Sequence, residues 1–326
     1  MSGARNFTIE EDDDLLSFLF RSLPSHGRNK VKSFLKYGSV SVNGKVVSRH
    51  DHPLHSGDKV CVQLDQKAAA EKDFLRSLID VVHEDETVVV VNKPEGLLTI
   101  STEKEQKETA YHRLNLYLNA ARKTSEKKTF QREVRKQKEI FVVHRIDREV
   151  SGLLLFARKE SDKLWLQENW KNFEKRYYAI VEGAPPKPEG TIESYLKENK
   201  FLNVFSSHKE IPGSKLALTH YRTLESAGKL SLLEIRLETG RKHQIRVHLA
   251  QELKTPIIGD DRYEAKTDPA GRLGLHAFYL AFEHPLSHEK MKFTLPLPGA
   301  LRQVLKNEAS SGTVKPSEGS ASRPSR

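Results

Sequence analysis

The stretch from Phe141 to Arg158, FVVHRIDREVSGLLLFAR, constrains the fold more than any other part of the chain. Two apolar runs, FVV and LLLFA, flank a short polar turn, and both have the length and composition of buried strands. The turn carries Asp147 close to Arg145 and Arg148. Neighbouring arginines favour the charged form of a carboxylate, so we expect Asp147 to be available as a nucleophile or base at neutral pH. Read alone, Asp147 could instead cap the turn or pair with Arg148.

The net charge of the 326-residue chain is +10, which favours a polyanionic partner, most commonly nucleic acid. A generally basic, solvated surface is the alternative. The length suits one large domain with a small one. Cys61 is the only cysteine, so neither an intrachain disulfide nor a cysteine metal cage is expected. The chain has no apolar run of about 18 residues and no signal sequence, which predicts no membrane association and a cytoplasmic location.

The first 64 residues change the sign of their charge along the chain. An acidic run, Glu10–Asp14, precedes the apolar LLSFLF, and acids suit a helix N-terminus. The window from Leu15 to His50 then holds seven basic residues and no acidic one. Within it, RNKVKSFLKYG predicts a helix with one buried face and with Lys32 and Lys36 on another face. SVSVNGKVV predicts a hairpin with an Asn-Gly turn, and KVCVQL predicts a further strand.

HRIDREVSGLLLFAR resembles the catalytic motif of the RluA-type pseudouridine synthases, HRLDRxTSGLLLFAK, a group that includes RluC and RluD. The sequence departs from this motif at Ile146, Val150 and Arg158, and none of these changes removes a chemical group from the reaction. The resemblance implies that Asp147 is the catalytic aspartate. It also implies that Arg145 helps to extrude the target base from the RNA.

Two further segments resemble motifs of the same family, in the expected order. EKRYYAIVEG resembles the KxYxA motif, which implies that Tyr177 lines the active site. Tyr178 alternates to the other strand face, where we expect it to pack in the core. TGRKHQIRVHLA resembles the third motif, which implies that Arg246 pairs with the catalytic aspartate and that Arg241 or His243 approaches the RNA backbone. Packing for Tyr177 and a purely structural ion pair for Arg246 are the alternatives.

Two loops also match the family. NKPEGL resembles the NKPxGL segment that opens the catalytic domain, with Lys93 either facing a groove as a phosphate contact or standing as a plain surface lysine. TPIIGDDRYEA resembles the PIxGDxxYG loop that borders the substrate cleft, with Glu264 in place of the glycine.

The N-terminal segments RNKVKSFLKYGSVSVNGKVV and SGDKVCV resemble the S4 RNA-binding domain. The resemblance implies that the basic helix face and the hairpin turn clamp structured RNA by its phosphates and its shape. A solvated basic helix beside a structural hairpin is the alternative. The residues implied to contact RNA are Arg28, Lys30, Lys32, Lys36 and Asn43.

These observations predict an S4-like RNA-binding domain over residues 1–64, a linker over 65–79, a pseudouridine synthase catalytic domain over 80–305 and a disordered tail over 306–326. The implied fold class is α/β (α+β), with a mixed, largely antiparallel sheet in the catalytic domain. We expect residues 122–139 to be an exposed, charged insertion. Residues 161–173 should form an amphipathic helix opened by a serine N-cap.

The implied function is the isomerisation of specific uridines to pseudouridine, with ribosomal RNA of the large subunit as the first expected substrate and tRNA as the second. No cofactor is expected, because the base stays bound while one glycosidic bond is exchanged for another. A non-catalytic S4-type RNA-binding or chaperone protein is the second hypothesis. A metal hydrolase is the third, but His243 and His248 lie at no common ligand spacing, so no metal is expected. A monomer is the default expectation.

Overall fold

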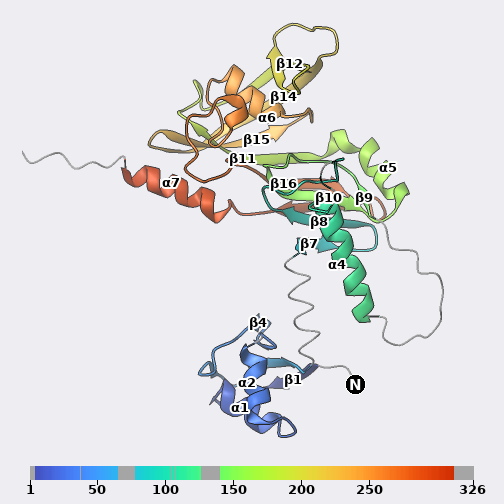
Figure 1. Ribbon diagram of the computed structural model, residues 1–326, viewed down its shortest axis with the longest axis vertical. Coiled ribbons are helices and arrows are strands. Elements are labelled where there is room, and N and C mark those ends of the chain that lie inside the picture. The colour runs from blue at the N-terminus through green and yellow to red at the C-terminus, as the bar shows by residue number, and fades with distance from the viewer. Residues whose placement is uncertain are drawn as a thin grey trace, which may run out of the picture. The chain divides into compact units, whose positions relative to one another are not determined.

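The computed structural model describes residues 4–36, 38–64, 78–103, 105, 107–125 and 140–311 (Figure 1). The chain divides into two compact units. One unit holds the described residues of Met1–Ile79 and of Leu114–Gln137, and the other holds those of Asp80–Arg113 and of Lys138–Arg326. Most of the expected linker lies outside the described residues, as do residues 126–139 of the expected insertion.

The first unit packs two helices, α1 (Leu15–Ser22) and α2 (Arg28–Lys36), with a sheet of four strands. The sheet order is β1-β6-β3-β4, and a two-stranded ribbon joins β2 to β5. The bounds of these strands are β1 Ala4–Thr8, β2 Asp13–Asp14, β3 Val40–Val42, β4 Lys45–Val46, β5 Pro53–Leu54 and β6 Lys59–Gln63. The expected helix, hairpin and strand are confirmed.

Local chemistry explains the boundaries in this unit. Asp14 caps α1, because its side chain accepts a hydrogen bond of 2.9 Å from the backbone N–H of Ser17, which confirms that the acidic run opens a helix. The apolar face of α2 is buried in the core of the unit. Asn43 and Gly44 both have positive φ values, of 51° and 79°, as the tight hairpin turn requires.

The second unit is built on an 11-stranded sheet in the order β13-β12-β14-β15-β11-β16-β10-β8-β7, with β17 paired to β16 and β9 paired to β10. Among the described strands, only β10 and β16 pair in parallel, so the predicted mixed, largely antiparallel sheet is confirmed. The strands are β7 Asp80–Glu84, β8 Val88–Lys93, β9 Phe141–Val142, β10 Ser151–Ala157, β11 Glu174–Glu182, β12 Glu189–Glu198, β13 Val204–Ser207, β14 Lys215–Ala227, β15 Leu230–Leu237, β16 Leu275–Glu283 and β17 Lys290–Thr294.

The helices and helical turns that follow α2 in the described residues are mostly short. They are α4 Ala110–Ser125, α5 Glu160–Glu168, the 3-10 turn η1 Trp170–Asn172, α6 Gln244–Val247, the π-helical turn η2 His248–Glu252, the 3-10 turn η3 Asp261–Tyr263 and α7 Gly299–Ser311. None of the helices in the described ranges is long and apolar enough to cross a membrane.

Two expected boundaries are corrected. The helix expected over 161–173 begins at Glu160 with Lys159 as its N-cap, and it ends at Glu168. Asn169 is its C-cap, and the Asn169 side chain donates to the Trp165 carbonyl over 2.9 Å. After it the chain tightens into η1. The disordered tail expected from residue 306 starts too early, because α7 continues to Ser311 and Glu308 accepts a hydrogen bond from the backbone N–H of Lys229.

Gly152 fits the centre of the sheet because it has no side chain. Its φ is +120°, and a Cβ atom there would overlap the backbone of Ala277 on β16. Gly152 and Ala277 are register partners in the parallel pair. Glycine therefore lets β10 run close beside β16 immediately after the turn that carries Asp147.

Candidate active site

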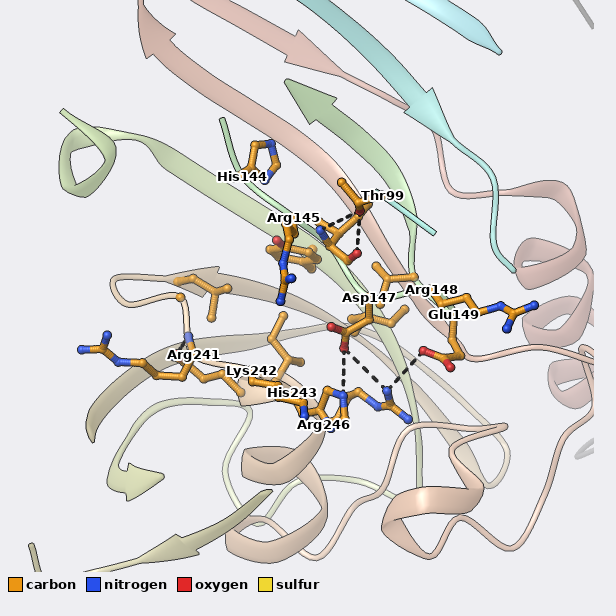
Figure 2. A pocket seen from close by; sticks show the side chains of 18 of the residues that line it. Thr99, His144, Arg145, Asp147, Arg148, Glu149, Arg241, Lys242, His243 and Arg246 are labelled. Carbon is orange, nitrogen blue, oxygen red and sulfur yellow. Dashed lines mark hydrogen bonds and ion pairs between the residues drawn. The ribbon is translucent and has the colours of Figure 1, made fainter. Parts of the chain in front are cut away.

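A cavity of about 540 Å³ gathers the three motifs in one place (Figure 2). It is lined by residues that lie far apart in the sequence: Arg145 and Asp147 before β10, Tyr177 on β11, and Arg241 and Arg246 around the start of α6. The predicted catalytic residues and the predicted base-flipping arginine therefore share one cavity.

The turn between β9 and β10 presents Asp147 to the cavity. Two of the residues that depart from the family motif, Ile146 and Val150, are buried and anchor the turn on either side. The Thr99 hydroxyl donates to the Ile146 carbonyl over 2.9 Å, and the backbone N–H of Val150 donates to the Asp147 carbonyl over 3.2 Å. These contacts leave the Asp147 side chain 30% exposed, so its carboxylate can meet a ligand.

Lys93 does not contact solvent, so the prediction that it contacts a phosphate is wrong. Its side chain is fully buried, and Nζ donates to the carbonyls of Pro94, Leu97 and Arg148 over 2.8, 2.7 and 3.1 Å. Burial lowers the pKa of Lys93 to about 8, opposed by the charges of nearby carboxylates. Lys93 ties the NKPEGL loop to the turn that carries Asp147.

Arg246 points one nitrogen at Asp147, but its closest partner is Asp260. Nη1 lies 3.6 Å from Asp147 Oδ2 and 3.6 Å from Glu149 Oε2. Dashed lines mark these two ion pairs in Figure 2. Nε and Nη2 donate to the two oxygens of Asp260 over 2.8 and 2.7 Å. Burial alone would lower the pKa of Arg246, but the hydrogen bonds and charge of Asp260 raise it, so the guanidinium stays charged.

Sequence reasoning did not single out Asp260, although it lies in the PIIGDDRYEA loop that matched the family. The Asp260 side chain is fully buried. Its bidentate contact fixes the plane of the Arg246 guanidinium. The carboxylate therefore determines where Nη1 of Arg246 points. In the same loop Glu264, which replaces the family's glycine, adopts a left-handed conformation with a φ of 64°.

His243 faces Asp147 rather than the outside of the cavity. Its Nε2 lies 3.8 Å from Asp147 Oδ2, and its Nδ1 lies 2.8 Å from the Tyr263 hydroxyl. Burial lowers the pKa of His243, while the charge of Asp147 opposes that shift. Of the two residues expected near the RNA backbone, only Arg241 is exposed at the cavity, where its Nε donates to the Leu216 carbonyl over 3.0 Å.

Tyr177 lies on the face of β11 that lines the cavity and is half-buried. Burial raises the pKa of its phenol, and the charge of Asp147 adds to the effect, so the hydroxyl stays protonated at neutral pH. Tyr178 alternates to the other face, where its ring stacks on Phe278 with 3.7 Å between ring centroids. The expected division between a site tyrosine and a packing tyrosine agrees with this placement.

His144, Trp170 and Lys175 form a second wall of the cavity that sequence reasoning missed. The His144 ring lies 4.6 Å from the Trp170 ring, and its Nε2 accepts a hydrogen bond of 3.1 Å from the backbone N–H of Leu155. Burial lowers the pKa of His144 to about 3, with a further contribution from the charge of Lys175. His144 is therefore neutral. The KxY spacing was the available signal for Lys175, since residues two apart on a strand share a face.

Arg145 is exposed in the same cavity. Within the described ranges, no hydrogen bond or ion pair of its side chain is found. Figure 2 shows the guanidinium extending from the turn into the space between Asp147 and Arg241. The group is therefore available to a ligand.

The predicted RNA contacts of the first unit divide into two kinds. Arg28, Lys30 and Lys32 are exposed on α2, whereas the Lys36 side chain lies outside the described part. Asn43 has a role in the fold: its amide donates to Asp58 over 2.7 Å and accepts from the backbone N–H of Lys59 over 2.9 Å. Its amide is thereby engaged in holding the hairpin turn, so the turn conformation explains this residue without RNA.

No group of three or more His, Cys, Asp or Glu side chains is placed to hold a metal ion in the described ranges. The cavity instead offers two carboxylates, Asp147 and Glu149, with several cations and the aromatic rings of Trp170 and Tyr177. Such a set can bind a nucleotide and can add to, or take a proton from, its sugar.

Comparison with known proteins identifies the family of this chain. The family model for RNA pseudouridylate synthases matches residues 87–251. An uncharacterised RNA pseudouridine synthase of Mycoplasma pneumoniae is 31% identical over 93% of this chain and 95% of its own length. Ribosomal large subunit pseudouridine synthase D of Neisseria meningitidis serogroup B is 30% identical over 88% of this chain and 76% of its own length.

A solved structure shares the fold. The human protein RNA pseudouridylate synthase domain containing 4 aligns with a TM-score of 0.56 and 22% identity, over 75% of this chain and 97% of the human chain. The family match and the fold are thus those of an RNA-modifying isomerase, and the chain belongs to the RNA pseudouridine synthase family. Enzymes of this family convert uridine in RNA to pseudouridine.

Proposed function

We propose that this protein isomerises uridines in ribosomal RNA of the large subunit and that Asp147 is the catalytic residue. The observation that carries the role of Asp147 is the position of its carboxylate, which faces the cavity between Arg246 Nη1 and His243 Nε2. The choice of RNA is supported by the relatives named ribosomal large subunit pseudouridine synthase D.

The reaction exchanges the N1–C1′ bond of uridine for a C5–C1′ bond. The ionised Asp147 either adds to C1′ of the ribose or removes the proton from C2′ to give a glycal, and both routes release uracil with the electron pair of the broken bond. The base then turns over and C5 bonds to C1′, which releases Asp147 from C1′ in the first route or is accompanied by return of the proton to C2′ in the second. The C5 proton is then lost and N1 gains a proton. The protein supplies position and charge, since the uracil never leaves.

Three residues support this chemistry in our proposal. Arg246 holds the Asp147 carboxylate in one direction while Asp260 holds Arg246. Tyr177 packs against the uracil with a protonated hydroxyl. Arg145, whose side chain extends into the cavity, takes the place of the extruded base. Extrusion costs a few kcal/mol, and a cation that occupies the vacated position offsets part of it.

The first unit is proposed to be an S4-like RNA-binding domain over residues 1–64. The exposed basic residues of α2, together with the net charge of the chain, support contact with phosphates. Arg28, Lys30 and Lys32 are the residues proposed to contact RNA there, and Arg241 is the proposed backbone contact at the catalytic cavity. Phosphate contacts position an RNA without reading its sequence, so the choice of uridine falls to RNA shape around the cavity.

The test is release of tritium from RNA labelled at uracil C5. Wild-type protein and Asp147→Asn are incubated with large-subunit ribosomal RNA or with tRNA, each transcribed without modification. We expect release from ribosomal RNA by wild type only, with equal RNA binding by both proteins. Turnover by Asp147→Asn would contradict the role of Asp147. Tritium release from tRNA alone would identify tRNA as the substrate. Binding of both RNAs without tritium release would favour a non-catalytic RNA-binding protein.

A further inference from the structure

Lys175 is a buried cation inside the cavity that the mechanism above does not use. Its side chain is 5% exposed. It lies two residues before Tyr177 on β11, on the face that lines the cavity. Burying a charged amine is costly unless something compensates for the lost water. The described residues around Lys175 offset little of this cost of burial.

The neighbours of Lys175 are neutral. Nζ donates to the Trp170 carbonyl over 3.2 Å and lies 4.9 Å from the centre of the Trp170 ring. His144, which stacks on the same ring, is uncharged at neutral pH because burial lowers its pKa. No carboxylate forms an ion pair with Lys175 among the residues that the structure describes. Burial lowers the pKa of Lys175 to about 8, so the amine is mostly charged at pH 7.

A negative charge that can balance the Lys175 ammonium forms during the reaction. When the N1–C1′ bond breaks, uracil keeps the electron pair, and the charge spreads onto O2 and O4. We propose that Lys175 is a catalytic residue whose ammonium donates a hydrogen bond to a carbonyl oxygen of this uracil anion. The cation would gain its full electrostatic partner only after bond cleavage, which is the kind of interaction that lowers a barrier.

The symmetry of the base suits a single fixed donor. A half-turn of uracil about the line through N3 and C6 exchanges N1 with C5 and also exchanges O2 with O4. An ammonium that meets O2 before the turn therefore meets O4 after it. Lys175 keeps its proton throughout, because it stabilises charge and the proton lost from C5 is balanced by the proton gained at N1.

This inference rests on the proposed reaction in this cavity. Variants of Lys175 and of Asp147 test the two claims separately. Lys175→Met keeps the length of the side chain and removes the charge. We expect kcat for tritium release to fall about 100-fold, with KM for RNA changed less than threefold and circular dichroism unchanged. Lys175→Arg should recover part of kcat. The control is Lys163→Met, another lysine over an aromatic ring, 5.8 Å from the centre of Phe141 and outside the cavity.

A kcat of Lys175→Met within threefold of wild type would overturn the inference and leave the role of Asp147 standing. Turnover by Asp147→Asn would instead overturn the proposed mechanism. A loss confined to KM would assign Lys175 to RNA binding and would also overturn the inference.

A pH profile keeps the inference testable if Lys175→Met does not fold. The value of kcat/KM reports the free enzyme, so for wild type it should fall above about pH 8, where Lys175 loses its proton. In Lys175→Arg the fall should move beyond pH 9, since arginine stays charged there. A fall at the same pH in both proteins would overturn the inference.

Other groups near the cavity do not explain such a change in Lys175→Arg, because they are present in both proteins. Burial lowers the pKa of His144 and raises that of Tyr177. Lys93 also has a pKa of about 8 but has no exposed surface. The remaining charged or titratable groups of the cavity wall are Arg145, Asp147, Arg148, Glu149, Arg241, Lys242, His243 and Arg246.

Discussion

Arg246 is bound to Asp260 at two points, over 2.8 and 2.7 Å, and reaches Asp147 only with its remaining nitrogen at 3.6 Å. One buried carboxylate therefore positions the arginine, and the arginine in turn positions the carboxylate that faces the cavity. This order of contacts explains how Asp147 can keep an arginine neighbour and still have an exposed side chain for the substrate.

Asp260→Asn should weaken catalysis through Arg246. The amide cannot accept two hydrogen bonds from the guanidinium, so Nη1 loses its fixed direction toward Asp147. We expect kcat for tritium release to fall about 100-fold with KM for RNA little changed, and the free energy of unfolding to fall by about 3 kcal/mol. The exposed neighbour Asp261→Asn is the matched control. Unchanged kcat in a folded Asp260→Asn protein would show that Arg246 needs no second carboxylate.

Tyr263→Phe should act on Asp147 through His243. The Tyr263 hydroxyl is 2.8 Å from His243 Nδ1, and its removal frees the ring that faces Asp147. We expect kcat to fall about tenfold, with a loss of stability of about 1 kcal/mol from one hydrogen bond. Turnover by Tyr178→Phe, on the opposite face of β11, should be unaffected. Equal turnover by the two variants would remove Tyr263 from the positioning of Asp147.

Gly152→Ala should destabilise the sheet at the parallel pair. The new methyl group would overlap the Ala277 backbone at a φ of +120°, and we expect a loss of about 3 kcal/mol or more in urea unfolding. Gly96→Ala is the control for backbone strain alone, because Gly96 has a φ of 76° with no atom within 4 Å of the added Cβ. Gly96→Ala should lower the free energy of unfolding by about 1 kcal/mol. Equal losses of stability in Gly152→Ala and Gly96→Ala would mean that the close approach of β10 and β16 does not add to the cost of the methyl group.

His248 should make the folded state sensitive to acid. It is fully buried, with its two nitrogens 3.0 and 2.9 Å from the Ser194 and Thr219 hydroxyls, and burial lowers its pKa to about 4. Between about pH 6.5 and pH 4 the unfolded chain binds a proton at this position and the folded chain does not, so stability is lost as the pH falls.

His248 should lower the free energy of unfolding by at most about 3 kcal/mol between pH 6.5 and pH 4. The measurement is the free energy of unfolding in urea at several pH values, for wild type, His248→Gln and the exposed control His208→Gln. His248→Gln should flatten the dependence between pH 6.5 and pH 4 and lower the stability at pH 7. The same slope in all three proteins would assign the acid sensitivity to other groups, such as His276, whose pKa burial also lowers to about 4.

The local elements were predictable where a short-range rule governs them. The apolar spacing of α2, the Asn-Gly hairpin and the acidic cap of α1 each depend on residues within one or two turns of each other. The alternation along β11 likewise separates Tyr177 from Tyr178, because successive residues of a strand point to opposite faces. The helix expected over 161–173 was wrong in its bounds. It ends at Glu168, where Asn169 forms the C-cap and the chain tightens into η1, and periodicity does not report this change.

The errors and omissions at the site have a common cause. From the sequence alone, Lys93 is expected at the surface, but in the fold the carbonyl of Arg148 in a distant turn helps to bury it. Asp260 is expected to be an ordinary loop residue, but in the fold it binds Arg246. Lys175 differs from other lysines only because strands and a 3-10 turn from separate segments bury it. These properties depend on contacts between residues far apart in the chain, and no local pattern contains them.

The sequence by itself determined the family, the type of sheet and the motifs that supply Asp147, Tyr177 and Arg246, because these depend on residue identity and order. Only the tertiary structure decided which cations are available in the cavity. Arg145 and Lys175 lack a carboxylate partner among the described residues, whereas Arg246 is engaged by Asp260 and Lys93 by backbone carbonyls. The physical reason is that the energy of a charge depends on burial and on its nearest opposite charge, and folding sets both.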